Sequence, residues 1–210
     1  MILEMLTLGA LYTNCYIAGC SETREGLIID PGFDRDTEAE KVLTRVHQHR
    51  LEVKYIVNTH GHPDHTAGNG LLKDATGAPI VIHELDAPKL TDSSKNLSLL
   101  FGLRVTSPPA DQTLKEGDII QAGKVQLKVL HTPGHSKGSI TLLGDNVVFT
   151  GDTLFAGSIG RYDFPDASYK EIMNSLKRLA TLPDHLKVYP GHGPTSTIGQ
   201  EKRSNPFLQM

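Results

Sequence analysis

The sequence predicts an α+β fold in which many short strands are combined with a few helices. Short apolar runs rich in Val, Ile and Leu recur along the chain, and turn residues such as Gly, Pro, Asp and Asn separate them. Two longer stretches, 36–49 and 168–179, place apolar residues at helical spacing with charged residues between them. At 210 residues the chain is long enough for one substantial core. We therefore expect a single domain over residues 1–210.

The first half of the chain predicts a series of strands interrupted by an amphipathic helix. Strands are expected at 2–8, 11–18, 27–29, 54–58 and 79–82. Ala39, Val42 and Val46 share one face of the 36–49 stretch, so this helix should cover a sheet. A short helix is expected through Leu71–Lys73.

The second half continues the same pattern after one irregular stretch. Further strands are expected within 114–120 and at 125–130, 139–143, 146–150 and 186–189. Ser168, with Glu171 three residues later, is typical of a capping box that starts a helix. Residues 91–107 show no clear period. They either form a helix and loop that cover the sheet, wall an active site, or bury a subunit contact, and the first alternative is favoured.

Charge and composition exclude several classes of function. The net charge is −3, the isoelectric point is near 6.3, and Lys and Arg are scattered, which disfavours nucleic-acid binding. The two cysteines, Cys15 and Cys20, form no C-x-x-C motif and are expected to be reduced. The first residues lack a basic leader, and no apolar run reaches membrane-spanning length. A cytoplasmic location without membrane contact is the resulting expectation.

One stretch, 59–68, holds the strongest functional signal. It places His60, His62, Asp64 and His65 within six residues, directly after the strand at 54–58. His60 and His62 can converge on one metal ion, and Asp64 and His65 can bind a second where a helix begins. Imidazole and carboxylate ligands suit zinc, iron or manganese. The alternative is a histidine-rich turn that binds no ion.

The pattern T-H-x-H-x-D-H resembles the metallo-β-lactamase superfamily. That resemblance implies a four-layer αββα sandwich of two mixed β-sheets flanked by helices, with the metals at one sheet edge. It also implies three ligands further along the chain, each after a strand-like run and a Gly. These are His135, Asp152 and His192. By the resemblance, His60, His62 and His135 bind one metal, Asp64, His65 and His192 bind the other, and Asp152 bridges them.

Within the superfamily the chain resembles glyoxalase II, because His65 and Asp152 are present and neither Cys15 nor Cys20 is near these residues in the sequence. This resemblance implies two divalent transition-metal ions, zinc first and iron or manganese as alternatives. The implied reaction is hydrolysis of a thioester such as S-lactoylglutathione by a metal-bridging hydroxide, with Asp64 and Asp152 as the catalytic carboxylates. The acyl group, the thiol carrier and the oligomeric state stay open.

The sequence leaves the roles of several residues near this site undecided. Arg161 matches a basic position that contacts glutathione in glyoxalase II, or it is a surface arginine in an ion pair. Asp163 replaces a Tyr of that family, and its helical C-terminal segment is mostly missing here. Asp30 either orients a ligand histidine or caps a turn. His83 is expected to be structural.

Two other functions are compatible with the sequence. Persulfide dioxygenases share this fold and the Gly-Arg-x-Asp-Phe pattern of residues 160–164, and their iron would be held here by His60, His135 and Asp152. A non-catalytic metal-binding or interaction module is the other alternative. The presence of all seven ligand positions favours an enzyme.

Overall fold

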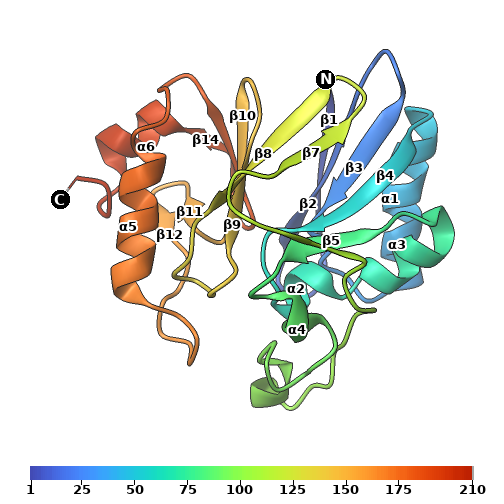
Figure 1. Ribbon diagram of the computed structural model, residues 1–210, viewed down its shortest axis with the longest axis horizontal. Helices are drawn as coiled ribbons and strands as arrows, with labels where there is room; N and C mark the ends of the chain where they lie inside the picture. The colour runs from blue at the N-terminus through green and yellow to red at the C-terminus, as the bar shows by residue number, and fades with distance from the viewer. Residues whose placement is uncertain (210) are drawn as a thin grey trace.

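The computed structural model describes residues 1–209 and has four layers, helix, sheet, sheet and helix (Figure 1). This is the predicted αββα arrangement. The first sheet has the order β1-β2-β3-β4-β5-β6, and the second has the order β14-β13-β10-β9-β8-β7. Both sheets mix parallel and antiparallel pairs. No helix among residues 1–209 is long and apolar enough to cross a membrane.

The first sheet is built from the N-terminal half of the chain. Its strands are β1 (Ile2–Leu8), β2 (Thr13–Gly19), β3 (Glu25–Ile29), β4 (Glu52–Asn58), β5 (Ile80–His83) and β6 (Gln112–Leu114). The helices α1 (Asp36–Gln48) and α3 (Asn69–Thr76) cover its outer face. Val42 and Leu72 pack there against Ile28 and Ile56, so the amphipathic helix predicted at 36–49 is confirmed.

The second sheet is built from the C-terminal half. Its strands are β7 (Ile119–Ala122), β8 (Val125–His131), β9 (Ile140–Leu143), β10 (Val147–Gly151), β13 (Lys187–Pro190) and β14 (Ser196–Thr197). The helices α5 (Tyr169–Leu179) and α6 (Ile198–Ser204) pack on its outer face. Ser168 caps α5, because its hydroxyl accepts a hydrogen bond from the Glu171 amide at 3.3 Å.

The two sheets share an apolar core and are joined at one end by hydrogen bonds. Side chains such as Leu27 and Val57 of the first sheet meet Leu127 and Phe149 of the second. The amide of Ile140 donates to the Thr59 carbonyl at 2.8 Å, and the amide of Asn14 donates to the Gly191 carbonyl at 2.7 Å. The first bond ties the end of β4 to the start of β9, and the second ties β2 to the end of β13, so each joins strands of different sheets.

Several predicted boundaries differ from the structure. The second strand begins at Thr13, because residues 10–12 belong to the turn after β1. The 114–120 region is divided: β6 lies in the first sheet, β7 lies in the second, and residues 115–118 cross between them. Two short strands, β11 (Leu154–Phe155) and β12 (Ser158–Ile159), and the helix α6 were not predicted.

Candidate metal centre

The predicted ligand residues all follow the ends of strands at the edge where the two sheets meet. His60 and His62 come directly after β4, and Asp64 and His65 lie in the single turn of α2 (Pro63–Thr66). The side chain of Asn58, the last residue of β4, donates to the His65 carbonyl at 3.0 Å. This bond holds α2 back against the strand end, so that His65 faces the same space as the residues after β4.

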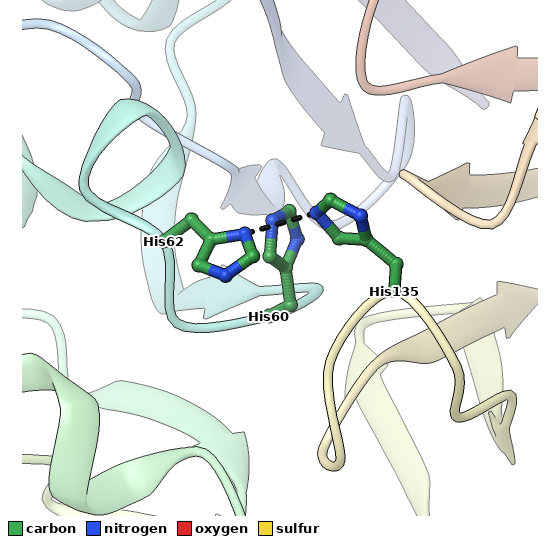
Figure 2. A group of neighbouring side chains, drawn as sticks. All are labelled: His60, His62 and His135. Atoms are coloured by element: carbon green, nitrogen blue, oxygen red, sulfur yellow. Dashed lines mark hydrogen bonds between the residues drawn. The ribbon is translucent and has the colours of Figure 1, made fainter. Parts of the chain in front are cut away.

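His60, His62 and His135 form the first group of possible ligands. One nitrogen from each ring lies within 4.8 Å of the others. Figure 2 shows the three rings turned toward one another, with Nδ1 of His62 at 2.9 Å from Nε2 of His135. The rings are buried, and Nε2 of His60 has no hydrogen-bond partner among the described residues. A buried nitrogen without a partner is costly unless a ligand or water reaches it.

Asp64, His65 and His192 form the second group. Nε2 of His65 lies 3.3 Å from Nε2 of His192, and Oδ2 of Asp64 lies 3.2 Å from the same His192 nitrogen. His65 is fully buried, whereas Asp64 and His192 are partly exposed toward a cavity. This group therefore has one closed side and one side that small molecules can reach.

Asp152 lies between the two groups. Its carboxylate oxygens are 3.4 Å from Nε2 of His65, 3.6 Å from Nε2 of His135 and 3.6 Å from Nε2 of His192. Its Oδ1 atom is buried and has no hydrogen-bond partner among the described residues. The carboxylate thus touches ligand candidates of both groups at once.

Two glycines allow this close approach. A Cβ atom on Gly191 would lie 2.1 Å from Oδ1 of Asp152, so no other residue fits there without displacing the carboxylate. Gly151 has a φ of +47°, and a Cβ atom there would lie 2.4 Å from the Thr59 hydroxyl. These contacts explain why a Gly stands directly before Asp152 and directly before His192, near the ends of β10 and β13.

The outward nitrogens of the histidines are held by other groups. Nδ1 of His135 lies 2.9 Å from the Arg161 carbonyl, and Nδ1 of His192 lies 3.1 Å from the Leu11 carbonyl. Nδ1 of His65 lies 3.0 Å from the Asp30 carboxylate. A proton held on Nδ1 leaves Nε2 free to bind a metal ion. Of the two roles open for Asp30, the structure supports orientation of a histidine.

The charges of the site suit bound cations. Burial, together with the adjacent imidazoles, lowers the pKa of His60 and of His62, which favours their neutral, ligating form. Burial alone would raise the pKa of Asp152, but His65 and the other rings outweigh it and hold that pKa below its usual range. Burial alone would lower the pKa of His65, yet Asp152, Asp64 and Asp30 raise it. Three carboxylates therefore surround one imidazole, an arrangement that favours positive charge.

A buried carboxylate that the sequence analysis missed joins two ligand loops. Oδ2 of Asp86 accepts from the Gly61 amide at 2.8 Å and from the Ser136 hydroxyl at 2.7 Å, and Oδ1 accepts from the Gly138 amide at 2.9 Å. Lys89 lies 3.2 Å from Asp86 and reaches Asp166 on the loop after Arg161. Asp86 precedes the short helix α4 (Ala87–Leu90), and nothing local in the sequence indicates these distant partners.

A cavity of about 730 Å³ opens onto both ligand groups. The segment 96–105 forms one wall of it, so the favoured prediction that residues 91–107 only cover the sheet is wrong. Several of its apolar side chains, Phe101 and Leu103 among them, line the cavity instead of packing on a sheet. Arg161 also lines it, with its guanidinium paired to Asp163. His83 lies outside the ligand groups and stacks on His131.

Comparison with known proteins agrees with this architecture. The model of the metallo-β-lactamase superfamily matches residues 8–192. The chain belongs to this superfamily. It is 36% identical to hydroxyacylglutathione hydrolase GloC of Haemophilus influenzae, and the alignment covers 99% of this chain and 98% of GloC.

Solved structures of the superfamily are also similar over the whole chain. BLEG-1 B3 metallo-β-lactamase is 34% identical, covers 100% of both chains and has a TM-score of 0.92. TTHA1623, solved in a di-iron-bound form, is 39% identical over 98% of this chain and 100% of its own, with a TM-score of 0.84. These relatives are named as a hydrolase and a lactamase, and TTHA1623 holds two iron ions in its solved form.

Proposed function

We propose that the protein is a binuclear metal-dependent hydrolase of thioesters. The observation that carries the proposal is the position of Asp152, whose carboxylate contacts both three-residue ligand groups. The groups are His60, His62 and His135, and Asp64, His65 and His192. A shared anion of this kind is what two neighbouring dications need to offset their mutual repulsion.

The residues fit metal ions by their chemistry as well as by their placement. Buried donor atoms of His60 and Asp152 lack hydrogen-bond partners among the described residues, and both residues belong to one group whose possible ligand atoms lie within 4.8 Å of one another. Nitrogen and oxygen donors without sulfur suit zinc, iron and manganese. Two such ions would make hydroxide available near neutral pH and would polarise the carbonyl of a bound acyl group.

The remaining side chains favour a thioester over an amide. Besides the ligand groups and Asp152, the ionisable side chains that line the cavity are Asp34 and Arg161, among the residues that the structure describes. Neither suits the role of a general acid for an amine leaving group. A thiolate departs without a proton donor because the pKa of a thiol is about 8.5. Asp64 faces the cavity 3.2 Å from His192 and is placed to accept a proton from water.

The similarity to GloC makes S-lactoylglutathione the first thioester to assay. In this proposal Arg161 contacts the carrier, since it stands at the cavity rim next to the ligand loop of His135. Its ion pair with Asp163 competes with a substrate carboxylate, because the pair already uses the Nε and Nη2 donors of the guanidinium. We therefore expect turnover of S-lactoylglutathione with a high KM.

The experiment compares a thioester with the amide of the same acyl group, and with S-lactoylglutathione, on the metal-loaded protein. An acyl thioester of N-acetylcysteamine, the corresponding amide and S-lactoylglutathione are incubated with the protein, with release of thiol or amine as the readout. The proposal expects hydrolysis of both thioesters, no detectable amide hydrolysis, and loss of both activities in Asp152→Asn. A protein that binds two metals but hydrolyses only a β-lactam, or nothing, would overturn it.

A persulfide dioxygenase is the second candidate. The observation in its favour is the loop Gly160–Phe164, which keeps the pattern of those enzymes and places Phe164 against His62 and His135, with ring centroids 5.3 and 6.2 Å apart. This function needs one iron held by His60, His135 and Asp152, with open positions for oxygen. Iron-loaded protein supplied with glutathione persulfide should then consume oxygen, whereas the thioesterase should not.

A further inference from the structure

The cavity beside the ligand groups is lined by apolar side chains from several segments. Phe101 and Leu103 of the 96–105 segment and Leu11 of the turn after β1 line it, although these side chains are 63%, 55% and 62% exposed. Phe164 lies against the first ligand group, and the Phe155 ring lies 6.1 Å from the His192 ring. Aromatic and aliphatic surface therefore reaches both groups of metal-binding residues directly. Exposed apolar surface of this kind marks a binding site.

The wall formed by 96–105 is held in one conformation by its own hydrogen bonds. The Asn96 side chain donates to the Val105 carbonyl at 2.8 Å, and the Val105 amide donates to the Ser98 hydroxyl at 3.2 Å. Leu97 has a φ of +72°, a conformation that is unfavourable for a branched side chain, yet its side chain is only 6% exposed. The fold thus keeps Phe101 and Leu103 at the cavity in spite of local strain.

The charges around the cavity do not match a carrier rich in carboxylates. Arg161 is the single Lys or Arg among the described residues that line it. Its Nε and Nη2 atoms donate to both oxygens of Asp163, and its guanidinium lies 4.0 Å from the centroid of Phe164. Asp34 adds a negative charge to the rim. An anionic group placed here would therefore be poorly compensated.

We propose that the preferred substrate is a thioester with an apolar acyl chain of about six carbons or more, which lies between the 96–105 wall and Phe164. This inference rests on the proposed thioester hydrolysis. Common thiol carriers bear charged or amide groups, so the apolar part of such a substrate is its acyl chain, and the carrier lies toward solvent. In the reaction the carbon–sulfur bond breaks, and water supplies the oxygen of the new carboxylate; one of its protons is taken up by the thiolate and the other is released to solvent.

The test uses N-acetylcysteamine thioesters of acetyl, butyryl, hexanoyl and octanoyl groups, because this carrier is small and uncharged. We expect kcat/KM to rise about two- to fourfold for each methylene that enters the cavity. Phe101→Ser should flatten this series, with a loss of about fivefold or more for the octanoyl compound relative to the acetyl compound. Leu100→Ser is the matched control: Leu100 is 64% exposed on the same segment but does not line the cavity, so the series should keep its slope.

A binding measurement separates this inference from the proposed function. The S-octyl thioether of N-acetylcysteamine has no carbonyl to attack, and calorimetry should show that it binds with a negative heat-capacity change. Phe101→Ser should weaken this binding several-fold. Hydrolysis of all chain lengths at equal kcat/KM, or a dimer in which Phe101 is buried and the thioether does not bind, would overturn the inference alone. If no thioester is hydrolysed the proposed function fails, and thioether binding then decides whether the cavity takes an apolar chain.

Discussion

The carboxylate of Asp30 lies 3.0 Å from Nδ1 of His65, and both side chains are buried. The same carboxylate accepts hydrogen bonds from the Thr59 amide at 2.7 Å and from the Thr59 hydroxyl at 2.6 Å. Asp30 therefore ties the end of β3 to the loop that carries His60 and to the helix turn that carries His65. One residue outside the ligand groups thus orients ligands of both.

Replacing Asp30 tests this orienting role. In Asp30→Asn the side chain keeps its size and tolerates the observed φ of +51°, but it no longer places a negative charge beside His65. We expect metal affinity or kcat to fall by about 10- to 100-fold. Competition with a chelator measures the affinity. Asp74→Asn, an exposed change on α3, is the matched control, and an equal loss in both variants would refute the role of Asp30.

Asp152 gives a sharper contrast because it contacts both ligand groups. Asp152→Asn should lose one metal ion per chain and more than about 100-fold in kcat, since even changes beyond the ligands commonly cost up to that factor. His83→Ala should retain both metal ions and the wild-type kcat, because His83 stacks on His131 away from the site. A folded His83→Ala protein as inactive as Asp152→Asn would show that the ligands are wrongly assigned.

Replacing Asp86 should lower the stability of the protein and weaken its binding of metal, because Asp86 joins two loops that carry ligand candidates. Its carboxylate is buried and receives hydrogen bonds from Gly61, Ser136 and Gly138. In Asp86→Asn an amide nitrogen must replace one acceptor, and we expect the free energy of unfolding to fall by about 2–4 kcal/mol. Denaturant titration of the metal-free protein measures it. Asp92→Asn, at an exposed turn, should change it by less than about 1 kcal/mol, and a similar loss in both would count against the network.

Replacing Arg161 and replacing Asp163 should have opposite effects on the affinity for the thiol carrier. Arg161→Ala should raise the KM for S-lactoylglutathione by about two- to fivefold with a smaller effect on kcat, because an exposed ion contact is worth little and acts equally in the ground and transition states. Asp163→Asn frees the guanidinium and should lower that KM. Neither change should alter KM for the uncharged N-acetylcysteamine thioesters, and an equal change for both carriers would show that Arg161 does not contact the carrier.

The parts of the fold that were predicted have regular local patterns. The helix at 36–49 buries one face, so its apolar residues recur at helical spacing. The strand at 54–58 buries consecutive residues, so its sequence contains a continuous apolar segment. The cluster at 59–68 was evident because its potential ligands are close in the sequence. His135, Asp152 and His192 required the family resemblance, since only the folded sheets bring them to this edge.

The parts that were missed depend on contacts between distant residues. Asp86 receives main-chain hydrogen bonds from Gly61 and Gly138, and a main-chain donor leaves no mark on the sequence. The 96–105 wall has no period because Asn96 and Ser98 bind its own backbone rather than a neighbouring strand. The short strands β11 and β12 have two residues each, too few to show alternation.

Elemental analysis of the purified protein tests the central claim most directly. The account predicts close to two transition-metal ions per chain, because two ligand groups share the Asp152 carboxylate. The count should fall to about one in Asp152→Asn and stay near two in His83→Ala. A reproducible single iron per wild-type chain, with oxygen consumed when glutathione persulfide is added, would contradict the binuclear hydrolase.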